Sequence, residues 1–408
     1  MRVVRWTLGI AGALMLPAVA VILVAALLID PDRYKSTIER AFKRETGRPL
    51  VLEGHLQLTW FPWLGVRTGA ARLGNAPGES GPDLIDWQSA QLRVRLLPLL
   101  LHRQLEVARI RIVGAHIGLR RGPAGEGNWE DLIARLHADS GANAPPTPAP
   151  SRSSPASTAI WAGLDLEDCS LDYADERTGE HVGLTDWQLS VGPWTAGEPL
   201  SARTSFVLHA QAAGASALQL PPAGVRVSLD LPRLQFHGSP LALAVPRFSL
   251  QVAEAELEGS VAAARDTTGQ WTASGSLAAV IASPRELIRT LGIHMSLPKD
   301  PAALAALSLS GNWSYRDGAL TLNPLLVKLD ETMLSGWVSR SGGPQAMWSF
   351  ALRADDVDFG RYLTQSKRQK PIELPVRALQ ALHARGTLEL DRARIDGTLM
   401  KDLRLQVQ

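Results

Sequence analysis

Runs in which apolar and polar residues alternate make up most of the chain after residue 160. Apolar residues occupy every second position in Val225–Leu231, Trp348–Leu352 and Leu403–Val407. A period of two is typical of β-strands that bury one face, and turn residues separate the runs. Roughly 20 strands are expected after residue 160, with too few helices between them for βαβ units. The pattern predicts a mainly β fold with a few short α-helices, as an elongated antiparallel sheet or, alternatively, a β-sandwich.

The predicted helices are short and carry recognisable end signals. Asp30 can cap a helix that Pro31 opens and Gly47 ends, because glycine readily adopts the left-handed conformation after a helix. Ser283 can cap a second helix, with a glutamate three residues later, and Asp300 precedes a third. Near the N-terminus, strands are expected at 50–60, 90–96 and 105–119.

An uncharged stretch of 24 residues, from Trp6 to Ile29, lies near the N-terminus. At about 1.5 Å per residue, such a helix spans a hydrocarbon core of roughly 30 Å. A cleaved signal peptide is the alternative, although its apolar core would hold only about 7 to 15 residues. Arg2 and Arg5 precede the stretch, which favours a cytoplasmic N-terminus. The predicted membrane-anchor residues are Trp6, Leu8, Ile10, Leu14, Leu16, Val19, Ile22, Leu23, Leu27 and Ile29.

The chain is expected to divide into four parts. Residues 138–158 are rich in Pro, Ala and Ser and contain no large aliphatic or aromatic residue, so they predict a disordered linker. The linker separates an N-terminal helix-and-sheet unit at 30–137 from a repetitive β-sheet body at 159–408. A cytoplasmic stub and the transmembrane anchor fill 1–29.

Composition and motifs argue against an enzyme. The 42 basic and 40 acidic residues nearly balance, so no general affinity for nucleic acid is expected. The sequence contains no nucleophile elbow, no phosphate-binding loop and no local histidine motif for a metal. Cys169, the single cysteine, lies in an alternating run and is expected to be a small buried apolar group. Asp355, Asp356 and Asp358 could ligate a hard cation, but a turn and helix cap is the simpler interpretation. We expect no catalytic site, metal or cofactor.

Aromatic residues close in sequence to the anchor have two interpretations. Trp60, Phe61 and Trp63 join two strand-like segments. They could lie at the membrane interface, where aromatic rings are enriched, or they could cap the core end of a hairpin.

A sheet with one apolar face must cover that face with a second sheet, with helices or with an apolar ligand. The predicted helices are too few, which leaves a sandwich or a ligand-lined groove. For a sheet tethered to a membrane, acyl chains are the natural apolar ligand. The candidate groove residues are Leu56, Leu58, Leu92, Val94, Leu189, Val227, Leu229, Leu243, Phe350 and Leu352.

Several segments resemble the AsmA family of bacterial envelope proteins. They are DPDRYKSTIERAFKRETGRPL and the residues that follow it to 78, SAQLRVRLLPLLLHRQLEVARIRIVGAHIGL at 89–119, and shorter stretches at 165–179, 283–293, 355–363 and 384–397. The resemblance extends over nearly the whole chain. It implies an inner-membrane anchor, a periplasmic body related to chorein-like bridge proteins, and a curved, groove-like sheet that conducts phospholipids. It supplies no catalytic residues.

The sequence therefore leads to one expected function and one alternative. We expect an inner-membrane, single-pass protein with a periplasmic body, which binds phospholipid acyl chains and contributes to outer-membrane biogenesis. The alternative is a scaffold or regulator that assists the assembly of outer-membrane proteins through contacts with outer-membrane or periplasmic partners. No nucleic-acid partner is expected.

Overall fold

The computed structural model describes residues 30–59, 63–76, 81–95, 106–107, 109–134, 160–195, 197–211, 220–238, 241–266, 268–293, 295–343, 346–362, 384–395 and 398–407. The predicted anchor and the predicted linker lie outside these ranges. No helix within them is long and apolar enough to cross a membrane. The chain divides into two compact units after Ala196, which we call unit 1 and unit 2.

Unit 1 begins with the predicted helix, which starts as a 3-10 turn, η1 (Pro31–Tyr34), and continues as α2 (Lys35–Thr46). Asp30 accepts a hydrogen bond from the Asp32 amide, and Gly47 ends α2 with φ 75°. The Asp32 carboxylate accepts the Leu56 amide at 2.8 Å and contacts His55 Nδ1 at 2.7 Å. These hydrogen bonds hold the pKa of Asp32 well below its usual range. The helix is thereby tied to the first strands.

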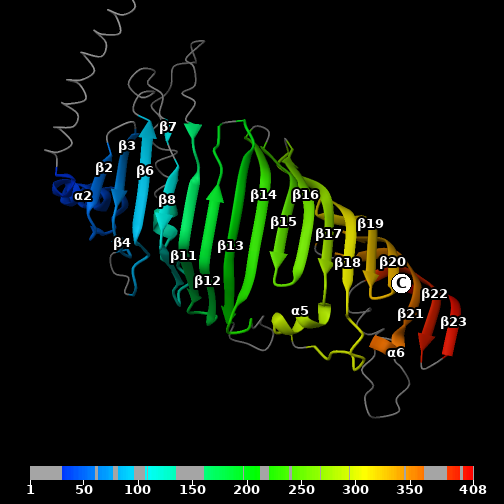
Figure 1. The fold of residues 1–408 in the computed structure, drawn as a ribbon. Coiled ribbons are helices and arrows are strands. Elements are labelled where there is room, and N and C mark those ends of the chain that lie inside the picture. Colours follow the sequence, from blue (N-terminus) through cyan, green and yellow to red (C-terminus); the bar gives the residue numbers. More distant parts are fainter. Residues whose placement is uncertain are drawn as a thin grey trace, which may run out of the picture. The chain divides into compact units, whose positions relative to one another are not determined.

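Twelve strands of unit 1 are described, most of them short before residue 160 (Figure 1). They are β1 (Leu50–Leu52), β2 (Leu56–Thr59), β3 (Trp63–Thr68), β4 (Ala71–Leu73), β5 (Ile85–Trp87), β6 (Ser89–Arg95), β7 (Glu106–Val107), β8 (Ile110–Val113), β9 (His116–Arg121), β10 (Ile160–Trp161), β11 (Leu164–Asp175) and β12 (Glu180–Val191). Phe42 of α2 and Trp87 pack on a cluster of buried residues, namely Leu50, Leu52, Leu56 and Ala71.

The single strand expected at 50–60 is broken into β1 and β2. Gly54 and Gly69 cross at the break, where the Gly54 amide donates to the Ala70 carbonyl at 2.7 Å. A Cβ on Gly54 would lie 2.4 Å from the Ala70 nitrogen, so the two backbones come too close for any side chain. The continuous strand expected at 105–119 is likewise divided, into β7, β8 and β9.

A buried arginine links two segments of unit 1 that are distant in the sequence. The Arg48 side chain has no exposed surface, and it donates to the Asn128 carbonyl and to the Asp131 carboxylate. The Asn128 amide group in turn donates to the Gly118 carbonyl at 3.0 Å. Residues 130–134 form a helical turn. These hydrogen bonds satisfy the buried charge, which would otherwise be costly.

Unit 2 contains eleven described strands, which follow one another across the sheet in sequence order (Figure 1). They are β13 (Leu200–Gln211), β14 (Val225–Gly238), β15 (Leu241–Val252), β16 (Ala255–Arg265), β17 (Trp271–Ile281), β18 (Leu307–Arg316), β19 (Ala319–Leu329), β20 (Thr332–Arg340), β21 (Trp348–Asp358), β22 (Ala384–Ile395) and β23 (Thr398–Val407). These strands are 9 to 14 residues long. After residue 160 the described strands, β10 to β23, number fourteen against the roughly 20 expected, because bulges let one strand continue past a break in alternation.

The expected antiparallel arrangement is wrong at four strand pairs, so the fold is mainly β with mixed sheets. In unit 1, β11 runs parallel to β8 and β9, and β10 runs parallel to β7. In unit 2, β21 runs parallel to β22. Each parallel pair joins strands separated by a long connection, which can return the chain to the end where the first strand began. Alternation carries no information on strand direction.

Two short helices and one turn lie beside the strands of unit 2. The helix α5 (Pro284–Thr290) is capped by Ser283, as predicted, and α6 (Phe359–Tyr362) follows β21. The helix expected after Asp300 is wrong, because residues 301–304 form only a turn. This turn is pinned by Arg285, which donates to the carbonyl oxygens of Pro298 and Ala303 at 3.1 Å or less. The backbone amides are satisfied without a helix.

Asp330 closes the same turn against β19 and α6. Its carboxylate accepts the amides of Leu304, Ala305 and Ala306 at 2.7 to 3.1 Å, and the Tyr362 hydroxyl at 2.8 Å. Burial alone would raise the pKa of Asp330, but these donors outweigh it and lower the pKa. Burial and the bond to Asp330 both raise the pKa of Tyr362. The carboxylate is therefore the acceptor that orders the turn.

Candidate functional site

The strand register gives unit 2 one apolar and one polar face, since directly opposed residues of neighbouring strands point to the same side. Leu229 pairs with Leu250, Leu250 with Leu257, and Leu257 with Ala279. The same line continues through Leu309, Val327, Leu334, Ala354, Leu390 and Leu403. Ser228, one residue before Leu229, pairs with Gln251 on the other side. We call these sides the apolar face and the polar face.

Bulges keep the apolar face continuous where alternation along a strand fails. The register shifts between Val245 and Phe248, so both side chains point to the apolar face although their numbers differ by three. The β18–β19 and β19–β20 pairs contain similar shifts, next to Trp313 and Leu325. The apolar face therefore crosses all eleven described strands of unit 2.

Most large side chains on the apolar face are only half-buried, including Leu229, Leu243, Phe350 and Leu352. Phe236, beside Leu243, is 52% exposed. Among the named elements of unit 2, each strand contacts its sequence neighbours extensively, and α6 packs against β22 from outside the sheet. Within the described residues, then, no second sheet covers this face, and α6 covers it only at the last strands, where Phe359 packs near Leu390.

The five candidate groove residues of unit 2 share the apolar face. Val227 is 9% exposed and pairs with Val252, two residues from the pair of Leu229 and Leu250. Leu243 pairs with Ala263. Phe350 and Leu352 pair with residues of β20 and β22, and these pairs also lie on the apolar face. Their common orientation is what a groove lining requires; their contact with a ligand stays a prediction.

The candidate groove residues of unit 1 are also on one face. Leu56 pairs with Thr68, and Thr68 pairs with Ala90. Two residues along the same strands, Leu58 pairs with Val66, and Val66 pairs with Leu92. Leu189 joins the same face through Leu166, Ile112 and Ala90. Leu56 belongs to the buried cluster at 6% exposure, whereas Leu92 is 44% exposed. Leu56 is thus a core residue, and Leu92 is the better candidate for ligand contact.

Of four further predicted positions, two are described through their backbone pairing alone and two are not described. Val94 pairs through its backbone with Leu64 in β3 and with Val107 in β7. Trp63 begins β3 opposite Arg95. Trp60 and Phe61 lie outside the described residues, so the interpretation of these rings as a membrane-interface group stays a prediction.

The polar face of unit 2 carries ion pairs and small side chains. Arg247 Nη2 donates to both oxygens of Glu258 at 3.1 and 3.2 Å. Arg353 donates from Nε and Nη2 to the two oxygens of Asp391 at 3.0 and 3.1 Å. These pairs are well exposed and contribute little to stability. They do neutralise the charges of this face, which makes it an ordinary solvated surface.

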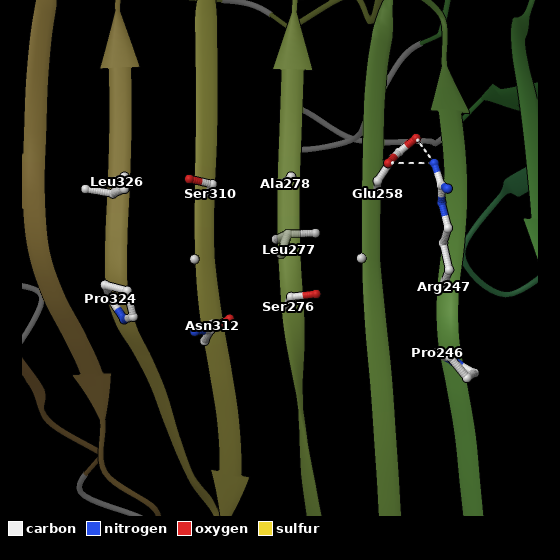
Figure 2. Close-up of a pocket in the computed structure, with 12 residues that line it drawn as sticks. Pro246, Arg247, Glu258, Ser276, Leu277, Ala278, Ser310, Asn312, Pro324 and Leu326 are labelled. Carbon is white, nitrogen blue, oxygen red and sulfur yellow. Dashed lines mark hydrogen bonds and ion pairs between the residues drawn. The ribbon is translucent and has the colours of Figure 1, made fainter.

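Two shallow hollows of unit 2 lie on this polar face and not on the apolar face. The larger one, about 630 Å³, is lined mainly by Ala and Ser side chains of β15 to β18. The other, about 480 Å³, is bounded by Arg247 and Glu258 at one side and by Pro324 and Leu326 at the other (Figure 2). Small side chains leave these depressions open, and the charged side chains that border the smaller one, Arg247 and Glu258, are exposed and paired with each other.

Glycines on the apolar face were missed by the sequence reasoning. Phe248 pairs with Gly259, Trp313 with Gly275, and Phe350 with Gly386. In each case a Cβ on the glycine would lie within 2.7 to 2.9 Å of an atom of the paired aromatic side chain. An aromatic side chain thus lies across a glycine of the next strand. The signal was a glycine in an alternating run, which marks a close backbone approach.

The described cysteine and the cluster of aspartates, which could in principle react or bind a metal ion, have structural roles. Cys169 is 1% exposed, as predicted, and burial raises the pKa of its thiol. Asp355 accepts the Met333 amide at 2.8 Å, while Asp356 and Asp358 pair with arginines of β22. No group of three or more acids, histidines or cysteines in the described part of the chain could hold a metal ion.

Comparison with known proteins supports the resemblance seen in the sequence. A family model described as the AsmA family matches residues 1–273, and so ends within β17 rather than near the C-terminus. No curated protein and no solved structure matches the chain. The family match supports, at family level, a role in lipid homeostasis of the cell envelope. Since the match covers more than half of the chain, this protein belongs to the AsmA family.

Proposed function

We propose that the protein binds phospholipid acyl chains on its apolar sheet face and so takes part in phospholipid transport or homeostasis between the inner and outer membranes. The proposed setting is a single inner-membrane anchor at 6–29 with the body in the periplasm. No catalysis is involved. The observation that carries the proposal is the apolar face of unit 2, which crosses every described strand of that unit and which no second sheet covers within the described residues.

Hydrophobic burial is sufficient for such binding. Each methylene group removed from water contributes roughly 0.8 kcal/mol, so an acyl chain of ordinary length gains several kcal/mol on an apolar surface. A bilayer offers the chain a similar gain, and movement between the two therefore has a small net free energy. The polar face, with its paired charges, stays in water. Together these properties suit passive binding and sliding rather than capture of one ligand.

The test measures lipid that remains with the full-length protein after purification from membranes in mild detergent. Native mass spectrometry and lipid extraction should find phospholipid with the unaltered chain. Leu229→Asp should remove most of it, because a carboxylate beside an acyl chain loses its hydration. Phe350→Asp should act in the same way on another strand.

Matched controls lie one residue away on the polar face. Ser228→Asp and Ser349→Asp add the same charge to the same strands, but on the side that Gln251 and Ser339 share. Both should retain lipid at the level of the unaltered chain. A folded protein without lipid, or equal lipid loss in all four variants, would contradict the proposal and favour the scaffold for outer-membrane protein assembly.

A further inference from the structure

The first helical segment of unit 1, η1 followed by α2, presents one side to the first strands (Figure 1). Phe42 packs on the buried cluster that includes Leu52. The Glu39 carboxylate accepts the Leu52 amide at 2.8 Å, and the Asp32 carboxylate accepts the Leu56 amide at the same distance. Two acidic side chains of the segment are therefore occupied by the backbone of the sheet.

The outward side of this segment carries a surplus of positive charge. Its exposed charged residues are the acids Asp30 and Glu45 and the bases Arg33, Arg40, Lys43 and Arg44. Arg33, Arg40 and Arg44 are spaced by seven and by four residues, which puts them on one side of a helix, and we call them the basic row. The Arg33 side chain is 82% exposed, and its ion pair with Asp30, at 3.6 Å, is open to solvent. The basic row thus points away from the sheet.

Two large apolar side chains lie next to the basic row and face solvent. Tyr34 is 55% exposed and Ile38 is 41% exposed. They are four residues apart, which is about one helical turn, so they share a side of the helix. A helix with an apolar side bordered by Arg and Lys can lie in the plane of a membrane interface, where the basic side chains meet lipid phosphates. Tyrosine is also enriched at that depth.

The place of this segment in the sequence brings it to a membrane surface when the predicted anchor spans the bilayer. The uncharged stretch ends at Ile29, and η1 begins at Pro31. Two residues reach at most about 7 Å, so a spanning anchor leaves η1 at the headgroups. The nearest partner of the outward side is then phospholipid. The charge of the basic row is opposite to that of an anionic lipid surface.

We propose that η1 and α2 lie flat on an anionic phospholipid surface. Tyr34 and Ile38 enter the headgroup layer, and the basic row meets the lipid phosphates. This inference rests on the anchor of the proposed function, and it specifies how the body meets the membrane. Because Asp32 and Glu39 tie the segment to β2 and β1, a helix held flat also fixes these strands beside the headgroups. Acyl chains that leave the membrane then reach unit 1 first.

The experiment measures how closely single positions of the full-length protein approach the lipid. The variants Tyr34→Cys and Ile38→Cys are labelled with a nitrobenzoxadiazole fluorophore and reconstituted in phosphatidylcholine vesicles with or without phosphatidylglycerol. Lipids that carry a nitroxide near the headgroup quench a label that touches them. Cys169 is 1% exposed, so the unaltered chain should take up no label.

Two control positions are labelled in the same way. Ser36 is exposed and lies two residues from both Tyr34 and Ile38, so Ser36→Cys puts the label on the opposite side of the same helix. Glu180 begins β12, which is five strand steps from β1 through β4, β5, β9 and β11, or roughly 24 Å across the sheet. All four labelled positions are exposed or partly exposed at the surface of unit 1, so the variants should keep the fold.

A pair of charge variants tests the role of the basic row. In the Ile38→Cys protein, one variant replaces the three arginines of the basic row by glutamine. The matched variant removes the same charge from exposed ion pairs on unit 2, through Arg203→Gln, Arg247→Gln and Arg353→Gln. Each basic residue near an anionic surface favours the bound state by roughly fivefold. Loss of the basic row should therefore remove most of the quenching at Ile38, whereas the matched variant should remove none.

The expected result is strong quenching at Tyr34 and Ile38 in vesicles that contain phosphatidylglycerol, with little at Ser36 and Glu180. Equal quenching at Ser36 and Ile38 would overturn the flat orientation. So would a vesicle-bound protein without quenching at Tyr34 and Ile38, or quenching that depends neither on phosphatidylglycerol nor on the basic row. A protein that does not float with the vesicles would instead contradict the anchor of the proposed function.

Discussion

Leu390 should be a main determinant of how firmly the last strands of unit 2 are held. Its side chain is 2% exposed and lies in a buried cluster with Ala354 and Ala393. Partly buried side chains pack against that cluster, namely Leu334, Val357, Phe359, Leu388 and Leu403. Replacing Leu390 by alanine removes the largest buried side chain of the cluster and leaves a cavity.

The size of the effect follows from the packing. Leu→Ala in a buried core costs about 2 to 5 kcal/mol, and the low end applies where the surroundings can relax, as in a single sheet layer. A loss of about 2 kcal/mol corresponds to a change of roughly 30-fold in the local opening equilibrium. Leu399→Ala is the matched control. Leu399 is 46% exposed on the polar face of β23, so its loss should change stability by less than about 0.5 kcal/mol.

Hydrogen exchange followed by mass spectrometry on the full chain measures both variants. In Leu390→Ala, amide exchange in peptides from β21, β22 and β23 should accelerate by roughly 30-fold, while peptides from β13 to β16 stay unchanged. The reasoning would be refuted by similar exchange in the Leu390→Ala and Leu399→Ala proteins. It would also be refuted by faster exchange over the whole of unit 2, since the cluster is confined to the last strands.

Three shorter predictions test other parts of the fold. Gly275→Ala puts a Cβ 1.8 Å from the Ser260 carbonyl oxygen, so thermal unfolding should show a free energy of unfolding lower by about 1 to 3 kcal/mol. The control Gly360→Ala puts a Cβ 3.2 Å from a flexible carboxylate and should be nearly neutral. The pKa of Asp330 is lowered in the fold, so its stabilisation is present above the ordinary value of 3.8 and is lost as pH falls below it; Asp330→Asn should abolish that part of an acid-unfolding curve. Arg48→Met should destabilise unit 1 by at least about 2 kcal/mol in denaturant titration, and Arg48→Lys should not restore it, because lysine lacks the planar fork.

Local signals in the sequence predicted several elements well. The first helix begins after Asp30 and ends at Gly47, and α5 begins after Ser283, because caps depend on side chains within three or four residues. The strand β6 and the first half of β14, Val225–Leu231, follow from alternation alone. The candidate residues Val227, Leu229, Leu243, Phe350 and Leu352 share a face for the same reason: a period of two puts every second side chain on one side.

Other features depended on contacts that no local pattern contains. The break at Gly54 arises from its crossing with Gly69, and the turn after Asp300 is held by Arg285 and by Asp330, which lie 15 and 30 residues away. The helix predicted after Asp300 was wrong because the backbone amides there donate to a side chain distant in sequence rather than to carbonyls one helical turn away.

The sequence by itself determined the class of the fold, the ends of the helices and the apolar nature of one sheet face, because propensity, capping and alternation act over a few residues. Tertiary structure decided strand direction, the position of the bulges, and the pairing of Gly259, Gly311 and Gly336 with leucines of neighbouring strands. Those features depend on register between strands, and register is set by packing and backbone approach across the sheet rather than along the chain.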